Sequence, residues 1–86
     1  DEIIARLESL MTGEKVFCDE DLSLQRLSDE IGIAPYQLSQ ILNERLNKNF
    51  NTYVNEYRVM EAAAMIVGEP SRSITSIAFA VGFDNK

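Results

Sequence analysis

The chain has 86 residues, of which 45% are hydrophobic and 26% charged, as in ordinary globular domains. It has no histidine and one cysteine, Cys18, which excludes an internal disulfide, the usual zinc sites and His-based nucleophilic catalysis. No apolar run approaches the roughly 18 residues of a membrane span, and the N-terminus lacks the basic region of a signal peptide. We therefore expect a small cytoplasmic domain without metal, cofactor or enzymatic activity.

The formal net charge is −6, which argues against nucleic-acid binding because nucleic-acid binders are usually basic. The excess of acid lies at one end of the chain. The first 30 residues contain nine acids and three bases, whereas the remainder contains five of each. The acidic run from Asp19 to Asp21 fits a solvated loop, and it can also repel DNA or dock a basic partner.

Helical spacing of apolar residues predicts a first helix over residues 2–12, with Gly13 as a left-handed C-cap. Residues 14–21 show no periodicity and are expected to form a loop. Val16 and Phe17 in this loop are expected to tuck under the domain.

Ser23 as N-cap and Gly32 as C-cap predict a second helix of about two turns. Pro35 suits the first position of a third helix, which we expect to run from Pro35 to Leu46. A short helix, a tight glycine turn and a longer helix form the pattern of a helix-turn-helix. The third helix is expected to bury Leu38, Ile41 and Leu42. Its outward face then carries Tyr36, Gln40 and Asn43, with Gln37 and Ser39 on the flanks.

Asn51 can cap a long fourth helix from Thr52 to about Val67, ending at Gly68. Apolar residues spread around much of this helix, which predicts contacts on more than one side. They are Tyr53, Val54, Tyr57, Val59, Ala62, Met65 and Ile66. A short fifth helix is predicted to follow, capped by Ser73, ending at Gly82, and with Ile74, Ile77, Ala78 and Val81 on its apolar face.

The two short helices align at a constant offset of 50 residues. The matched pairs are Ser23 and Ser73, Leu24 and Ile74, Leu27 and Ile77, Ile31 and Val81, Gly32 and Gly82, and Ile33 and Phe83. This register indicates one supersecondary unit used twice, although any two short helices with a serine cap and a glycine stop share such classes. If the repeat is real, Asp84 caps a second recognition helix, of which only Asn85 and Lys86 are present.

The residues that follow this pattern resemble the AraC/XylS type of transcription regulator. The resemblance covers about residues 22–86 and rests on Leu24 to Gly32, Leu38 to Asn43, Phe50, Tyr53, Arg58, Ala62 and the segment from Ser73 to Phe83. The segment with Ile77 and Ala78 placed three residues before Val81, Gly82 and Phe83 is its most specific part. A second similarity, to a subgroup with membrane-bound sensor portions, implies a membrane-anchored parent protein.

The resemblance implies an all-α fold with a first helix-turn-helix subdomain (residues 1–50), a connecting helix (51–68) and a partial second subdomain (69–86). It further implies sequence-specific binding to double-stranded promoter DNA, transcription activation, and a sensory or dimerisation domain elsewhere in the parent protein. Two such units can place helices in successive major-groove segments about 34 Å apart. The sequence departs from the family in its second recognition helix, which is absent, in Ala34 where a serine cap is usual, and in an outward face without the frequent arginine.

The positions that match base-contacting ones in the family are Tyr36, Ser39, Gln40 and Asn43. Gln40 and Asn43 can each make paired amide hydrogen bonds to adenine, whereas Tyr36 can contact a thymine methyl or a phosphate. Gln37, Arg45, Lys48 and Arg72 are candidate phosphate contacts. An ordinary solvated helix face and scattered surface charge are the alternatives.

A second functional hypothesis is a protein-interaction module that docks RNA polymerase or a sensory partner through its acidic surface. Arg58 is expected to be structural, holding the connecting helix to a carbonyl or to Glu61. Cys18 is expected to be inert, because the acids beside it disfavour its thiolate.

Overall fold

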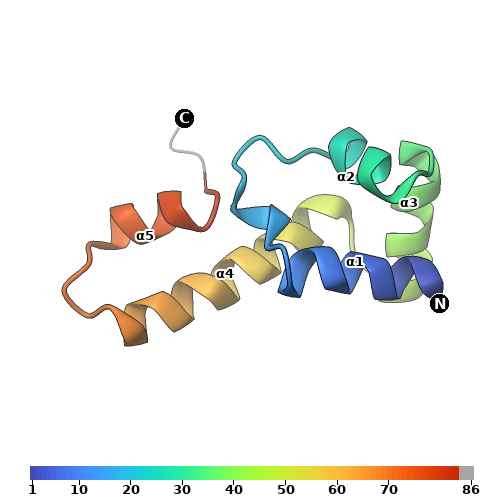
Figure 1. The fold of residues 1–86 in the computed structure, drawn as a ribbon. Coiled ribbons are helices and arrows are strands. Elements are labelled where there is room, and N and C mark those ends of the chain that lie inside the picture. The colour runs from blue at the N-terminus through green and yellow to red at the C-terminus, as the bar shows by residue number, and fades with distance from the viewer. Residues whose placement is uncertain (84–86) are drawn as a thin grey trace.

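The computed structural model describes residues 1–83, which form an all-α fold and thus confirm the predicted fold class. The elements in chain order are α1 (Glu2–Thr12), the 3-10 turn η1 (Val16–Cys18), α2 (Leu24–Ile31), α3 (Pro35–Ile41), the π-helical turn η2 (Leu42–Leu46), α4 (Phe50–Gly68) and α5 (Ile74–Ala80). The molecule is elongated, with extents of 41 × 26 × 21 Å. Figure 1 shows α2 and α3 at one end of the molecule and α5 at the other, with α4 running between them.

A single core joins α1, η1, α2, α3 and the first half of α4. Its buried residues are Leu7, Leu10, Met11, Phe17, Leu27, Leu38, Leu42, Tyr53 and Val54. Burial of each large apolar side chain stabilises the fold by about 1.5–3 kcal/mol. Phe17 stacks on Tyr57 with ring centroids 5.9 Å apart, and Tyr57 meets the edge of Tyr53 at 5.4 Å. The predicted packing of Phe17 under the domain is therefore confirmed.

Polar side chains cap the helices, in part as predicted. The Ser23 hydroxyl accepts from Arg26 N at 3.1 Å, and the Ser73 hydroxyl accepts from Ser76 N at the same distance. The prediction that Asn51 caps α4 is wrong. Asn49 Oδ1 accepts from Thr52 N at 2.8 Å, so α4 begins two residues earlier and brings Phe50 against the core.

The prediction of a left-handed Gly13 is also wrong. Gly13 has φ −88° and ψ −62°, and the left-handed conformation falls on Lys15 at φ 51°. The chain therefore reverses two residues later than expected. This later reversal feeds directly into η1, which directs Phe17 into the core.

Arg58 ties the loop after α1 to the middle of α4. Its Nε donates to the Phe17 carbonyl at 2.8 Å and its Nη2 donates to the Asp19 carbonyl at 3.0 Å. Partial burial lowers the pKa of Arg58. The predicted structural role through a carbonyl is confirmed, but Glu61 forms an ion pair with Lys15 instead.

The second unit consists of α5 packed on α4. Ile77 and Val81 are buried, and Gly82 repeats the positive φ of Gly32, at 106° against 87°. One expectation fails here: Ile74 is 65% exposed, because α5 packs through the face that carries Ile77 and Val81. The broad apolar surface predicted for α4 is partly covered. Both η1 and α5 contact this helix, whereas Val59, Met60, Ile66 and Val67 are exposed.

The expectation for Asp84, as cap of a second recognition helix continuing through Asn85 and Lys86, lies outside the described residues. The division into three units at residues 50 and 68 stays a prediction. Within residues 1–83, no helix has the length and apolar character that crossing a bilayer requires.

Gly82 generates a stability prediction. A Cβ at this position would overlap the Phe17 carbonyl oxygen and lie 2.8 Å from Arg58 Nε, in addition to the strain of a positive φ. We expect Gly82→Ala to lower the free energy of unfolding by at least about 2 kcal/mol. Gly32→Ala, which meets no neighbour, is expected to cost only the strain of about 1–2 kcal/mol.

Urea unfolding followed by circular dichroism measures both effects. Gly68→Ala is the matched control, because Gly68 has no close neighbour and lies at the end of α4. Equal losses for Gly82→Ala and Gly68→Ala would contradict the proposed steric contact.

Candidate nucleic-acid interface

The turn between α2 and α3 positions the candidate interface. Gly32 adopts φ 87° and ψ 31°, and the amides of Gly32 and Ile33 both donate to the Ser28 carbonyl, at 2.8 and 3.1 Å. The left-handed residue reverses the chain sharply, and Pro35 then starts α3 with its φ already helical. Leu38 and Leu42 are fully buried and anchor α3 to the core.

This anchoring turns the outward face of α3 toward solvent. Tyr36 is 71% exposed, and Gln37, Gln40 and Asn43 are exposed as well. Ser39 is half-buried at the flank. The structure therefore brings the predicted base-contacting side chains together on one helix, with Ser39 the least accessible of them.

The amide side chains on this face each hold one bond within their own helix. Gln40 Nε2 donates to Glu44 Oε1 at 3.0 Å, and Asn43 Nδ2 donates to the Ser39 carbonyl at 3.0 Å. Gln37 Oε1 accepts from Ala34 N at 2.9 Å. Gln40 and Asn43 each use one amide N–H and Gln37 uses its amide oxygen, so every one of these side chains keeps a donor for an outside partner.

The helix that carries this face does not end as a regular α-helix. It passes into the π-helical turn η2, and Asn47 ends it in the left-handed conformation at φ 56°. The sequence predicted the end of the helix correctly at Leu46 but not the wider last turn. π-helical turns are rare and carry no simple sequence signal.

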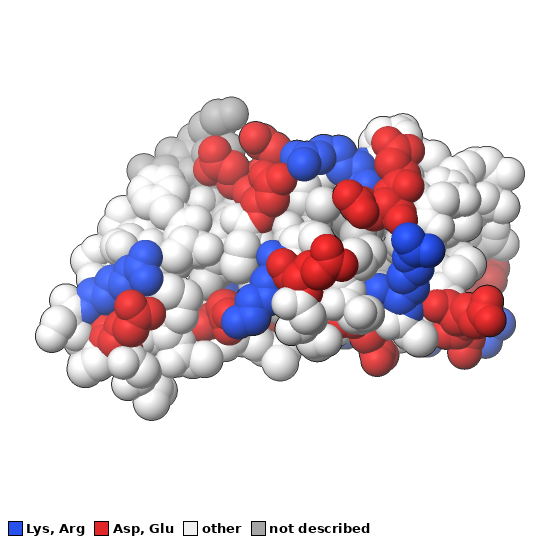
Figure 2. Space-filling model, in the orientation of Figure 1, with Lys and Arg blue, Asp and Glu red and all other residues white. Residues whose placement is uncertain are grey.

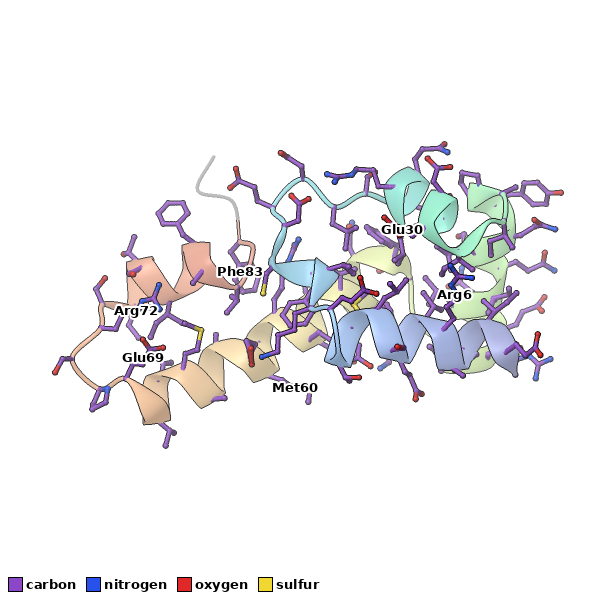
Figure 3. All side chains as sticks on the ribbon, viewed as in Figure 1. Arg6, Glu30, Met60, Glu69, Arg72 and Phe83 are labelled. Atoms are coloured by element: carbon purple, nitrogen blue, oxygen red, sulfur yellow. The ribbon has the colours of Figure 1, made fainter. Side chains whose placement is uncertain are left out.

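The basic candidates all have acidic partners. Lys48 pairs with Glu56, Arg45 lies 3.9 Å from Asp1, and Arg72 lies 3.3 Å from Glu69. Arg72 Nε also donates to the Ser76 hydroxyl at 2.8 Å. Figure 3 shows Arg72 beside Glu69 at the far end of α4, so the structure does not bring Arg72 together with the α3 face.

Two further bases have acidic partners, and a third bonds a backbone carbonyl. Arg26 pairs with Asp19 at 3.0 Å and Lys15 pairs with Glu61, while Arg6 donates to the Glu30 carbonyl at 2.9 Å. Figure 2 shows no extended basic area on the face turned to the viewer, and blue side chains there lie next to red ones. Within residues 1–83, most of the positive charge available to a polyanion therefore belongs to bases that must first leave an acidic partner.

Glu44 was not among the predicted site residues, although it lies on the outward side of the same helix. The spacing of four residues from Gln40 was the signal that could have identified it, because residues at this spacing share one helix face.

Among the described residues, no group of three or more potential ligands is arranged to hold a metal ion.

Cys18 is half-buried, and its pKa is raised chiefly by burial and then by Glu61. The inert assignment is therefore supported, but for a different reason from the neighbouring acids that the sequence suggested.

The comparisons with known proteins agree with this geometry. A family model described as a helix-turn-helix domain matches residues 27–86. Among solved structures, the chain is similar to the C-terminal domain of AraT, a response regulator from Geobacillus stearothermophilus. The TM-score is 0.85 at 25% sequence identity, and the match covers 98% of this chain and 67% of that one. None of the curated proteins matches the chain.

Ala34 generates a prediction for this helix. Ala34 occupies the N-cap of α3 but offers no side-chain acceptor to the first turn. We expect Ala34→Ser to raise the free energy of unfolding by about 0.5–1 kcal/mol, because the hydroxyl can accept from a free amide of that turn. The measurement is urea unfolding. Ala64→Ser, at an exposed position inside α4, is the control and should cost about 0.5 kcal/mol. A loss of stability in both variants would contradict the capping argument.

Proposed function

Because the chain belongs to the AraC-type family of helix-turn-helix domains, we propose that it is the sequence-specific DNA-binding part of a bacterial transcription regulator. Members of this family are DNA-binding domains and not enzymes. In the proposal, the helix from Pro35 to Leu46 enters the major groove of promoter DNA. The observation that carries it is the exposed, amide-rich outward face of α3 and η2, whose one charged side chain is Glu44, positioned by the turn at Gly32.

The chemistry of the outward face suits base edges. A glutamine or asparagine side chain offers one acceptor and two donor hydrogens in a plane, which matches the N6 and N7 atoms of adenine in the major groove. We assign this role to Gln40 and Asn43, with Tyr36 and Ser39 beside them. Asn43 must turn its amide away from the Ser39 carbonyl, or use its free oxygen and second hydrogen, to contact a base.

The phosphate contacts that we propose require partner exchange. Lys48 and Arg45 flank the C-terminal end of the helix and pair with Glu56 and Asp1. Exposed ion pairs contribute only about 0–1 kcal/mol, so a DNA phosphate can replace the carboxylate. Gln37 can donate its amide hydrogens to a phosphate while its oxygen caps Ala34. Arg72 lies at the other end of α4 and would contact a phosphate there only after leaving Glu69.

Similarity to the AraT domain suggests the context. We propose that the chain is the output domain of a response regulator, with a domain that receives the signal elsewhere in the parent protein. We place the parent's DNA-binding part in the cytoplasm.

DNA binding by the regulator can activate or repress transcription. We propose activation, with RNA polymerase as a partner at the promoter. A promoter–reporter fusion that loses expression when the intact regulator is supplied would contradict activation.

An acidic hollow favours a second candidate function, the docking of a basic protein partner. Asp19, Asp29 and Glu30 line this hollow together with Arg26, beside the apolar Val16 and Leu22. This surface lies on the loop and α2, not on the outward face of α3. A pull-down with the intact regulator that recovers only nucleic acid would count against this candidate.

Gln40 provides the direct test of base readout. We expect Gln40→Ala to weaken binding to the regulator's own upstream DNA by about 1–3 kcal/mol and to leave binding to random duplexes nearly unchanged. Fluorescence anisotropy titrations of the intact regulator measure both affinities. Gln25→Ala is the matched control, because Gln25 on α2 bonds Asp29 at 2.9 Å with the same four-residue spacing. An equal loss on both DNAs would contradict a base-specific role of Gln40.

Glu56 tests the exchange of ion pairs. Glu56→Gln removes the partner of Lys48, and we expect affinity for every DNA sequence to rise about two- to fivefold, as one weak competing pair is lost. Lys48→Ala should lower the affinity for all sequences and reduce the slope of log affinity against log salt by about 1.

Glu61→Gln is the control for this experiment, because it frees Lys15, which follows the C-terminal end of α1 and is not part of the recognition helix. Equal effects of Glu56→Gln and Glu61→Gln would show that only net charge matters and would remove Lys48 from the interface.

A further inference from the structure

The contact between Gln40 and Glu44 constrains what the outward face of α3 can read. Glu44 is exposed and lies one helical turn beyond Gln40, where its Oε1 accepts from Gln40 Nε2 at 3.0 Å. If the Gln40 amide were rotated by half a turn, its oxygen would lie against the Glu44 carboxylate, and two acceptors would repel each other. The contact therefore fixes which way the Gln40 amide is turned.

This orientation determines which polar atoms of Gln40 remain free to contact a base. One N–H is committed to Glu44, and the amide oxygen and the second N–H remain. Adenine presents an acceptor at N7 and a donor at N6 in the major groove, and this is the complementary pair. Glu44 thus holds Gln40 ready for adenine before DNA binds, which saves part of the cost of ordering the side chain.

Glu44 can also contact a base directly. Its Oε2 has no hydrogen-bond partner within residues 1–83, and a carboxylate only accepts. In the major groove, guanine presents only acceptors and thymine an acceptor and a methyl group. Adenine offers the N6 amino group beside the acceptor N7, which repels a carboxylate, whereas cytosine offers the N4 amino group alone. The carboxylate therefore favours cytosine at a neighbouring base pair and opposes guanine and thymine there.

The negative charge of Glu44 adds a second kind of discrimination. The nearby cations, Arg45 and Lys48, face Asp1 and Glu56 and leave Glu44 without an ion-pair partner among the described residues. A carboxylate close to the DNA is repelled by the phosphates, and only a base with an amino group opposite the carboxylate offsets this repulsion. Non-specific complexes are consequently weakened more than the specific one.

We propose that Glu44 is a specificity-determining residue: it positions Gln40 for adenine and itself selects cytosine at a neighbouring base pair. This role rests on the proposed function of the α3 surface and refines it. It also accounts for the lack of arginine on this face, since arginine is the usual reader of guanine and would pair with Glu44 instead.

The test is the selection of binding sites from a random duplex library by the full-length regulator. We expect the wild-type protein to enrich sites that carry adenine next to a cytosine. Glu44→Ala should lower the preference for cytosine over thymine by about tenfold, blur the preference for adenine, and raise the affinity for random duplexes severalfold. Gln40→Ala should abolish the preference for adenine and keep the preference for cytosine.

Glu14→Ala is the matched control, because Glu14 is exposed and follows the C-terminal end of α1, whereas Asp1, the partner of Arg45, precedes the N-terminal end. It makes the same change in charge and should leave the selected motif unaltered. Persistence of the full cytosine preference in Glu44→Ala, or a wild-type motif with any base other than cytosine at that position, overturns the role of Glu44 alone. Failure of the wild-type protein to select any motif overturns the proposed function as well.

Discussion

The guanidinium of Arg58 is the interaction on which the rest of the structure depends. It donates to two carbonyls of the loop after α1: that of Phe17, for which it supplies the donor, and that of Asp19, which also accepts from Leu22 N at 3.1 Å. The same group lies under Gly82 and 5.9 Å from the ring of Phe83. One side chain therefore joins the loop that carries Phe17, the middle of the long helix and the end of α5. Phe17 shares its core with Leu38 and Leu42 of the recognition helix, so this junction links the first unit to the end of the second.

The sequence was most informative where local chemistry decides the conformation. Ser23, Gly32 and Pro35 each act on the backbone within a few residues, and the helix ends around the turn were predicted correctly. The errors fall where distant packing decides. Asn49 rather than Asn51 caps α4 because Phe50 packs against the core, and Ile74 is exposed because α5 contacts α4 through another face. No local pattern distinguishes these alternatives.

The candidate site shows the same division. Which side chains of α3 face outward follows from helical periodicity, and the sequence predicted them. The ionic partners of Arg45 and Lys48 come from the N-terminus and from α4, so only the folded chain reveals them. The net charge of −6 comes from 14 acids against eight bases, and most of the described bases are paired with acids. Weak internal ion pairs can be exchanged for phosphates, while the outward face, which carries no basic side chain, contributes preference among sequences and no general attraction to DNA.

The long helix α4 has a consequence for how such a chain can change over evolution. Its 19 residues span about 27 Å at 1.5 Å per residue, and its two ends fix where α3 and α5 stand. Inserting or deleting one residue would shift α5 by about 1.5 Å and rotate it by about 100° around the helix axis. If both units bind one face of DNA, α4 works as a ruler matched to the pitch of the double helix. Exchanges of its exposed side chains are then tolerated far more readily than any change in its length.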